Sequence, residues 1–510
     1  MAIKVLSQVT TSQLEDFIYD IDVGDPKLYE ELKNPYKIGL FQINGSTAEQ
    51  LCDKMLPENF AELTALNAMA RPGPMEASAP YYVKRKAGEK SPYPDVLNNL
   101  IQDTHQVFIY QEQVMEIFHK IGGFTLEEAN EVRSLMKKLG KLEKDPKDLK
   151  KWDVIVKKFT DGAMKNGITE SMAKTIATDL AAFSSYSFCK AHASSYAYIA
   201  AITIYLSIYY RRWFYASVLA YEVDREKYLL DRLYSVKNQK IDILPPDINK
   251  SQVHFAPEGE NVRFGLADIK YVSVTAAEAI MKNRPYSSLF DFIVKTRSRI
   301  ITSKTIKALI SVGAFDFLTK ERKRLIMVLD AYWDKRDSSK IVDKLRATYE
   351  EGEARLMNTA GLDTTEDDLV AYEKDYFGFR FFSSPFKGKI IEDFRQLRLK
   401  NLIYISLPEV GSTPKKVPVF INSIRNHKDK NGNPMAFIEI EDVRGNRMTV
   451  PIFYSHFQYM GDLISENSLY LMYLYNDGGK LFFGKKERLD NYAEKERRME
   501  AARWLGKRKT

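Results

Sequence analysis

An uncharged segment at residues 191–210 leaves two kinds of fold open to this chain. It reads AHASSYAYIAAITIYLSIYY and contains no Lys, Arg, Asp or Glu. A helix of about 20 apolar residues is long enough to cross a bilayer. This segment, however, is rich in Ser and Tyr, contains His192 and continues into RRWFY, which is more typical of a helix buried in a large protein. We therefore predict a buried helix and no membrane association.

The length and composition indicate an intracellular protein with several domains. A chain of 510 residues is too long for one hydrophobic core, and 45% hydrophobic with 28% charged residues is ordinary for a globular protein. The formal net charge of +8 is a modest basic excess that many enzymes share. Cys52 and Cys189 are the only cysteines and lie far apart, which excludes a disulfide framework and a cysteine-rich zinc site.

Hydrophobic periodicity divides the chain into a long helical part and a strand-rich part. Apolar residues recur at helical spacing to about residue 239, and ILPPDIN (243–249) then predicts a linker. Residues 264–284 are expected to form a helix, a tight turn and a second helix. Five strand-like runs follow, with turn signals at Asn431-Gly432 and 477–479: VPVFINSI, PMAFIEIE, RMTVPIF, LYLMYLY and KLFFG. The predicted fold is multidomain and mainly α, followed by a small all-β barrel of the oligonucleotide-binding (OB) type.

Acidic and hydroxyl residues mark two candidate helix starts and one candidate metal site. Thr125 with Glu128 three residues later is a capping box. Asp20 and Asp22, one residue apart, would share one face of a strand and could bind one Mg²⁺. The alternative is a connecting stretch in which Asp25, before Pro26, caps a short helix.

Polar and aromatic residues interrupt the apolar pattern of two segments that are expected to be helical. IYQEQVM places Tyr110, Gln111 and Gln113 close together, and FSSYSFCKAHASSYAYIA carries Lys190, His192 and Tyr196. One interpretation is a partly buried helix whose polar groups are satisfied. The other is a surface for an anionic, aromatic ligand such as a nucleotide, with cations for phosphate and rings for stacking. The residue types alone leave both open.

Six sequence strings resemble one family. In chain order they are NAMARPGPMEAS, THQVFIYQEQVMEIFHKIGGFTLEEANEVRSLM, FSSYSFCKAHASSYAYIAA, ILPPDIN, FGLADIKYV and LISVGAFD. Together they are similar to the alpha subunits of bacterial DNA polymerase III, the family C replicative polymerases, over roughly residues 1–320. EKDYFGFRFFSSPF (373–386) further resembles the family segment that leads to an OB barrel.

The resemblance implies a domain order. It runs from the C-terminal edge of the palm (1–15) through the fingers (16–240), a helix-hairpin-helix module (241–320), a helical linker region (321–400), an OB-fold (401–490) and a basic C-terminal helix (491–510). Ile3-Lys4-Val5-Leu6 resembles the end of the motif that carries the third palm aspartate of the family. The three aspartates that bind Mg²⁺ would then precede Met1, and Asp20 with Asp22 would not be the palm pair.

The resemblance therefore implies that this chain contains no catalytic or metal-binding residue of its own. A separate palm-containing chain would supply the aspartates and with them Mg²⁺, either because the gene is split, which we favour, or because this is a truncated copy. The expected function is that of the fingers and DNA-binding part of a replicative DNA polymerase, which binds dNTPs and primer-template. The alternative is a non-catalytic DNA-binding remnant or accessory subunit.

The implied dNTP-binding residues are cations and rings. Arg133 matches the first arginine of the family's paired-arginine motif, and Ser134 stands in place of the second. Lys137 and Lys138, one helical turn onward, could compensate as point charges. The other implied dNTP-binding residues are Arg71, Lys190, His192 and Tyr196. Arg71 lies on a turn that the prolines are expected to hold non-helical to residue 80, and around Lys190 the motif is broken by Cys189 and Ala191. The resemblance separately assigns Tyr110, Gln111 and Gln113 to the fingers motif. His192 could equally be a core histidine.

The implied DNA-binding residues are Lys270 and Tyr271, in the segment that resembles a helix-hairpin-helix. Backbone N–H groups of that motif contact phosphates without reading sequence. Family members have glycines in the hairpin, whereas KYVSV has none. The Phe- and Tyr-rich barrel would stack on single-stranded template, although at least half of its rings are expected in the core. A sliding-clamp peptide is not evident between 317 and 372, so a clamp partner stays open. The resemblance places the protein in the cytoplasm of a bacterium or a phage-infected bacterium.

Overall fold

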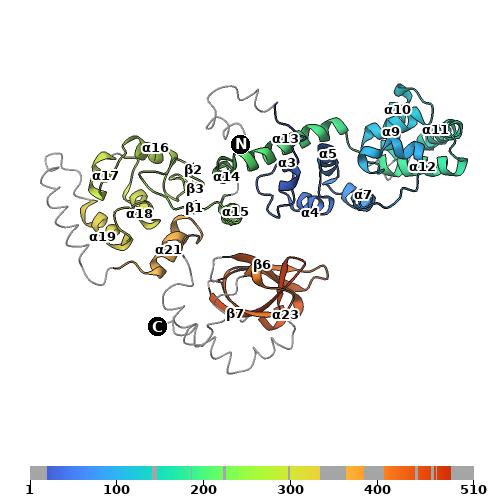
Figure 1. The fold of residues 1–510 in the computed structure, drawn as a ribbon. Helices are drawn as coiled ribbons and strands as arrows, with labels where there is room; N and C mark the ends of the chain where they lie inside the picture. The colour runs from blue at the N-terminus through green and yellow to red at the C-terminus, as the bar shows by residue number, and fades with distance from the viewer. Residues whose placement is uncertain are drawn as a thin grey trace. The chain divides into compact units, whose positions relative to one another are not determined.

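The computed structural model describes residues 20–139, 146–184, 186–221, 225–296, 299–333, 363–383, 407–442, 446–460, 464–466 and 468–483. The chain divides into two compact units (Figure 1). Unit 1 comprises residues 1–244 and 255–263, and unit 2 comprises residues 245–254 and 264–510. The predicted palm edge (1–15), much of the predicted linker region and the predicted C-terminal helix (491–510) lie outside the described residues.

Unit 1 is helical apart from one small sheet. Its helices are α3 (Pro26–Glu31), α4 (Ser46–Met55), α5 (Phe60–Met69), α6 (Pro74–Ala77), α7 (Ala79–Lys86), α8 (Asp95–Leu100), η1 (Gln102–Thr104), α9 (Gln111–Lys120), α10 (Leu126–Leu139), α11 (Pro146–Lys165), α12 (Glu170–Ser184), α13 (Lys190–Tyr209), α14 (Arg211–Ala220) and α15 (Arg225–Asn238). The sheet has the order β1-β3-β2, from β1 (Ile243–Leu244), β2 (Ala256–Glu258) and β3 (Asn261–Arg263). β1 is parallel to β3, and β2 is antiparallel to it.

The uncharged segment forms α13, which contacts α3, α5 and α14 (Figure 1). Ala193, Ala197 and Ala200 are completely buried, and their small side chains allow neighbouring helices to approach. Other positions, such as Ile199 at 41% exposure, face outward. The predicted buried helix is thus confirmed for one side of α13. Within the part of the chain that the structure describes, no helix is long and apolar enough to cross a membrane.

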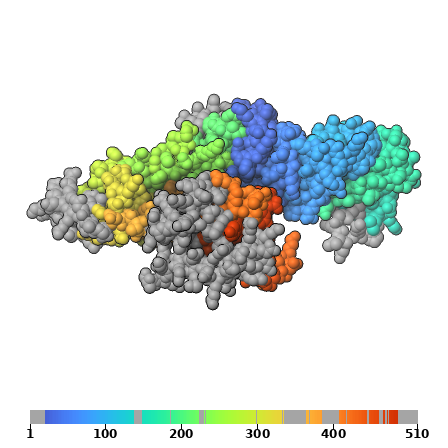
Figure 2. Space-filling model, turned by 60° about the horizontal axis from the view of Figure 1, so that its bottom comes forward, coloured from blue at the N-terminus to red at the C-terminus, as the bar shows by residue number. Residues whose placement is uncertain are grey.

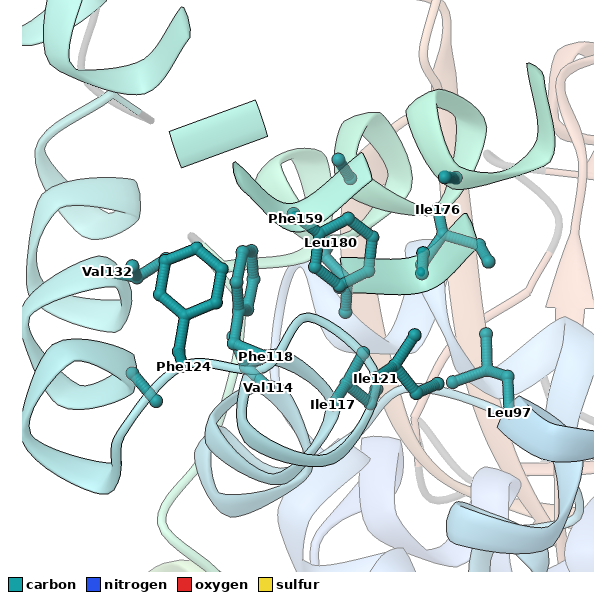
Figure 3. Close-up of a cluster of buried hydrophobic side chains, with 14 of the residues drawn as sticks. Leu97, Val114, Ile117, Phe118, Ile121, Phe124, Val132, Phe159, Ile176 and Leu180 are labelled. Carbon is teal, nitrogen blue, oxygen red and sulfur yellow. The ribbon is translucent and has the colours of Figure 1, made fainter. Parts of the chain in front are cut away.

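Helices α9 to α12 pack around one hydrophobic core and appear as the light-blue to teal lobe of unit 1 in Figure 2. Phe118 lies at its centre, with ring-centroid distances of 5.4 Å to Phe124 and 4.9 Å to Phe159 (Figure 3). The predicted capping box begins α10: Glu128 N donates to Thr125 Oγ1 at 3.1 Å, and Thr125 N donates to Glu128 Oε2 at 2.8 Å. The core and the cap together fix the position of α10.

The start of unit 1 decides between the two interpretations of its aspartates. Asp22 lies in a turn, where its Oδ1 accepts a hydrogen bond from Gly24 N at 2.8 Å. Asp25 caps α3 by accepting from Lys27 N at 2.9 Å, with Pro26 as the first helical residue. The predicted cap is confirmed, and the strand that would align Asp20 with Asp22 does not form.

The proline-rich stretch after α5 is non-helical only as far as Gly73, whose φ is +92°. Pro74 opens α6, and Pro80 lies in the first turn of α7. The expectation of a non-helical turn to residue 80 is therefore wrong beyond Gly73. Proline is tolerated in the first turn of a helix, because the amide it lacks has no helical partner there.

Unit 2 contains a helical module and a five-stranded sheet. The helices are α16 (Val274–Lys282), α17 (Leu289–Lys295), α18 (Ser303–Ser311), α19 (Arg322–Tyr332), α21 (Glu366–Tyr376) and α23 (Tyr454–Met460), with the short η3 (Leu407–Glu409). The helix expected at the start of 264–284 is wrong, since residues 266–271 form turns. Their backbone pairs elsewhere: Leu266 N donates to Gln252 O at 3.0 Å, and Ala267 N donates to Val253 O at 2.8 Å.

All five predicted strands are present: β4 (Lys415–Lys428), β5 (Pro434–Glu441), β6 (Arg447–Ile452), β7 (Ser468–Asp477) and β8 (Lys480–Phe483). They form an antiparallel sheet of order β6-β5-β4-β7-β8. Gly432, with φ +82°, sits at the predicted β4–β5 turn. Because no ladder joins the described residues of β6 and β8, the sheet is open, and the predicted closed barrel is not confirmed.

Candidate functional site

The turn before α13 is attached to the start of α9 by a parallel bridge between Tyr110 and Phe188. Gln111 N donates to Phe188 O at 2.8 Å, and Phe188 N donates to Ile109 O at 3.1 Å. Two segments almost eighty residues apart in sequence, which both carry predicted site residues, therefore meet here. We refer to residues 186–189 as the junction turn.

Gln113 and Tyr110 are buried residues at the start of α9, next to the junction turn. Gln113 Oε1 accepts from the backbone N–H groups of Ile109 and Tyr110 at 2.8 and 2.9 Å, and its Nε2 donates to Thr104 Oγ1 at 2.7 Å. Tyr110 is 2% exposed, and burial raises its pKa far above the usual value. Gln113 therefore holds the backbone at the start of α9 in place, and the Tyr110 side chain is almost entirely buried.

Arg71 reaches the junction turn from the end of α5. Its Nε donates to Ala68 O at 3.0 Å, and its Nη2 donates to Tyr186 O at 2.7 Å. The guanidinium carbon lies 4.2 Å from the centre of the Phe188 ring. Gly73 makes room for this arrangement, because a Cβ there would lie 2.6 Å from the Tyr186 ring. Burial lowers the pKa of Arg71, but a guanidinium stays charged at neutral pH.

Arg133 reaches the same place from α10. Its Nη1 donates to Gln111 Oε1 at 2.9 Å, while its Nε and Nη2 both donate to Asn130 Oδ1, at 3.1 and 3.0 Å. Gln111 in turn donates through Nε2 to Ser187 O at 3.3 Å. Arg133 is thus fixed against the junction turn by neutral amides.

The start of α13 supplies a third cation and two rings. Lys190 Nζ lies 3.8 Å from Asp103 Oδ2 and 5.6 Å from the centre of the Tyr110 ring. His192 is exposed, and its ring centroid lies 5.4 Å from that of Phe188 and 4.2 Å from that of Tyr196. An exposed His192 is not a core histidine. The rings of Phe188, His192 and Tyr196 form a continuous row beside the cations.

Glu112 closes the N-terminus of α13. Its two carboxylate oxygens accept from Lys190 N at 3.0 and 2.9 Å, and Cys189 Sγ lies 3.5 Å from Oε1. A carboxylate in this position satisfies an amide that has no helical partner and complements the helix dipole. Glu112 therefore ties α9 to α13 at the junction turn.

The turn before α16 in unit 2 holds the two predicted DNA-binding residues. Lys270 is exposed, and its backbone N donates to Tyr376 O at 2.8 Å. Tyr271 is 51% exposed and has φ +68°, a conformation that glycine adopts most easily. Tyr271 O accepts from Thr305 Oγ1 at 3.0 Å, and Lys304 Nζ lies 3.6 Å from the centre of the Tyr271 ring. The backbone thus takes a glycine-like turn without a glycine.

Metal ligands do not gather in the described residues: no group of three or more His, Cys, Asp or Glu side chains there could hold an ion.

Comparisons with known proteins identify a family. The family model for the bacterial DNA polymerase III alpha subunit finger domain matches residues 1–167, and a helix-hairpin-helix model matches residues 240–325. The DNA polymerase III subunit alpha of Staphylococcus epidermidis is 30% identical over 489 residues, which cover 92% of this chain and 43% of that protein. That of Aquifex aeolicus is 32% identical over 440 residues, which cover 84% of this chain and 35% of that protein.

The chain belongs to the family of bacterial DNA polymerase III alpha subunits. It spans less than half the length of the two relatives described above. The finger model covers α9 and α10, which lie within residues 1–167. The junction turn and α13 follow the last residue that the model matches.

Most of the predicted dNTP-binding residues lie near the junction turn. Arg71, Arg133 and Lys190 all contact the junction turn or the α9 start, and His192 and Tyr196 extend from it. Lys137 and Lys138 belong to α10, but their side chains lie outside the described part of the structure. Sequence reasoning missed Asn130 and Lys304, for which no sequence signal was evident. Glu112 is part of the polar run in IYQEQVM, but no role at the site was predicted for it.

Proposed function

We propose that this chain is the nucleotide- and DNA-binding part of a replicative DNA polymerase, with the junction turn as its site for an incoming dNTP. The observation that carries the proposal is the way two arginines are held. Arg71 and Arg133 are fixed by carbonyl and amide oxygens, and neither makes an ion pair with a described residue. Their positive charges are therefore positioned but not neutralised, as a site for a triphosphate requires.

Each part of the site would have its own task. Arg71 uses Nε and Nη2 to hold the turn, so Nη1 is left to donate to phosphate. Arg133 would bind a second phosphate oxygen, and Lys137 and Lys138 would add point charges where Ser134 replaces an arginine. Lys190 would complete the cationic side, while the exposed His192 and the Tyr196 ring would contact the base or sugar.

Unit 2 would bind the primer-template. We propose that residues 241–320 contact the phosphate backbone through Lys270 and the turn at Tyr271, and that residues 401–490 form an OB-type module for single-stranded template. The proposed domain order is otherwise the one that the family resemblance implies. A sliding clamp is a further partner that we leave open. We place the protein in the cytoplasm of a bacterial or phage-infected cell.

The chemistry also needs carboxylates that hold Mg²⁺, which activates the primer hydroxyl and neutralises the leaving pyrophosphate. We propose that a separate palm-containing chain supplies them. Asp22 and Asp25 of this chain are already engaged as backbone acceptors. This chain's own residues would bind the triphosphate, orient it and hold the DNA.

Reconstitution tests the proposal. The chain is mixed with the polypeptide that carries the palm aspartates, and single-nucleotide primer extension is measured against dNTP concentration. Arg133→Ala should raise the apparent KM by about tenfold or more, because a hydrogen bond to a charged group contributes roughly 1.5–3 kcal/mol. Arg85→Ala is the control, since Arg85 lies in α7 and donates to Glu89 O rather than to the junction turn.

Two results would argue against the proposal. An Arg133→Ala variant with the KM of the parent would remove Arg133 from the site. A chain that binds primer-template but never forms a nucleotide-stabilised ternary complex with its partner would instead be the non-catalytic DNA-binding remnant.

A further inference from the structure

One side of α11 in unit 1 is lined with lysines. With 3.6 residues per turn, positions 150, 151, 154, 157, 158, 161 and 165 fall on the same side of the helix. They carry Lys150, Lys151, Lys157, Lys158 and Lys165, together with Val154 and Asp161, and all seven are exposed. The opposite side buries Phe159 and Ala163 in the core of the α9–α12 lobe. We call the exposed side the lysine face.

The lysine face is not neutralised by its surroundings. Lys158 pairs with Glu128 at 2.6 Å. Lys150, Lys151, Lys157 and Lys165 make no ion pair with any residue that the structure describes. Asp161 lies on the face itself, and Asp148 and Asp153 flank it. Several positive charges are therefore available along one helix.

The size of the lysine face fits an extended anion. From Lys150 to Lys165 the helix rises about 22 Å, since each residue adds about 1.5 Å. A nucleoside triphosphate is too short to contact both ends. The uncharged side chain on this face, Val154, is aliphatic and 70% exposed. Nucleic-acid bases stack on aromatic rings, so Val154 offers them no stacking surface. The lysine face is therefore suited to bind successive phosphates of a nucleic acid, whatever its base sequence.

The lysine face lies close to the proposed dNTP site. Glu128, the partner of Lys158, precedes Arg133 by five residues on α10, or about 7.5 Å along the helix axis. In a polymerase, the template continues as an unpaired strand beyond the base that pairs with the incoming dNTP. A strand leaving the junction turn would reach α11 within a few nucleotides.

We propose that the lysine face of α11 binds the phosphate backbone of the single-stranded template ahead of the dNTP site. This inference rests on the proposed function and adds to it a path for the unpaired template. Lysines suit the role because a mobile strand needs point charges that exchange partners easily, whereas arginine forks fix geometry. The contact would secure the template without selecting its sequence.

The test compares template overhangs in the full chain. Two labelled primer-templates share one duplex, and the template extends past the primer by a single nucleotide in one and by a long oligothymidine tract in the other. Affinities are measured by fluorescence anisotropy over a range of salt concentrations. The test variant is Lys150→Gln/Lys151→Gln/Lys157→Gln, and the matched control is Lys33→Gln/Lys120→Gln/Lys174→Gln, in which each lysine pairs with an exposed glutamate elsewhere.

The test variant should lose about tenfold in affinity for the long overhang and little for the short one. Its salt slope on the long overhang should become shallower by about 2, because each phosphate neutralised on a single strand contributes roughly 0.7. The control should match the parent. Circular dichroism would confirm that both variants fold.

Three outcomes would overturn the inference: equal losses on both overhangs, no loss on either, or the same loss in the control. A variant that binds DNA normally but loses affinity for polyglutamate would assign the face to an acidic protein partner. The short-overhang substrate separates this inference from the proposed function, since a nucleotide-stabilised ternary complex on it depends on the junction turn and not on α11.

Discussion

Lys304 Nζ lies directly over the ring of Tyr271, 3.6 Å from its centre. Tyr271 has φ +68° in the turn that precedes α16. A non-glycine residue in this conformation costs about 1–2 kcal/mol. A cation over an exposed ring returns about 0.5–1 kcal/mol, and the Tyr376 ring, 6.1 Å away, adds a further contact. The pair thus offsets part of the strain of the turn.

Substitutions at Tyr271 should separate strain from ring contact. Tyr271→Ala keeps the strained backbone and loses the ring, so the free energy of unfolding should fall by about 1 kcal/mol. Tyr271→Gly loses the ring and the strain together and should be more stable than the alanine variant by a similar amount. Urea unfolding followed by circular dichroism measures both. An alanine variant as stable as the glycine variant would mean that residue 271 does not have positive φ.

Gly162→Ala should destabilise unit 1. In most helix interiors this change stabilises by up to about 1 kcal/mol. Here a Cβ would lie 2.2 Å from Gly122 O, so α11 would have to move away from the end of α9. We expect a loss of about 1–3 kcal/mol, measured by urea unfolding. Gly411→Ala is the control, since it lies outside the helices and an added Cβ there meets nothing within 4 Å. A stabilised Gly162→Ala variant would contradict the close approach.

Glu112→Gln should weaken both the α13 start and nucleotide binding. The amide can still accept from Lys190 N, but it no longer complements the helix dipole, so we expect a loss of about 0.5–1 kcal/mol in stability. Displacement of the junction turn should also raise the KM for dNTP in the reconstituted polymerase. Glu116→Gln, which removes an exposed pair with Lys120, should change neither by a comparable amount. An unaltered KM for dNTP would mean that Glu112 caps α13 but has no effect on nucleotide binding.

The buried Cys52 should resist labelling and make the stability of the fold depend on pH. Burial raises the pKa of Cys52 to about 11, so at pH 8 iodoacetamide should label Cys189 and leave Cys52 unlabelled until the chain unfolds. The unfolded thiol releases its proton near pH 8.5. The folded state then holds a proton that the unfolded state has lost, so stability should decline as pH rises from about 9 towards 11. Cys52→Ala should remove that part of the decline, and Cys189→Ala should not.

Local rules predicted much of the fold. The alternation in VPVFINSI and PMAFIEIE places Val417, Val419, Ile438 and Ile440 inward, because alternate residues of a strand share one face. Asp25 and the Thr125–Glu128 pair predicted two helix starts correctly, since caps depend on residues within a few positions.

Contacts distant in sequence account for the errors. Residues 266–267 have a helical pattern, but their amides donate to Gln252 and Val253, and no local pattern announces that pairing. At the site, the family resemblance grouped Arg71, Arg133 and Lys190, whereas the residue types alone left both interpretations open. Neither predicted that Gln111 connects Arg133 to the junction turn, because that hydrogen bond joins residues from separate helices.

The bridge between Tyr110 and Phe188 links the positions of Arg71 and Arg133. A small molecule wedged beneath the Phe188 ring would push Arg71 off its face and shift Gln111, and with Gln111 the guanidinium of Arg133. A single bound molecule would thus misalign both Arg71 and Arg133. Substitutions at Phe188 that prevent binding of such a molecule would be difficult to find, because the new side chain must still pack against the Arg71 guanidinium.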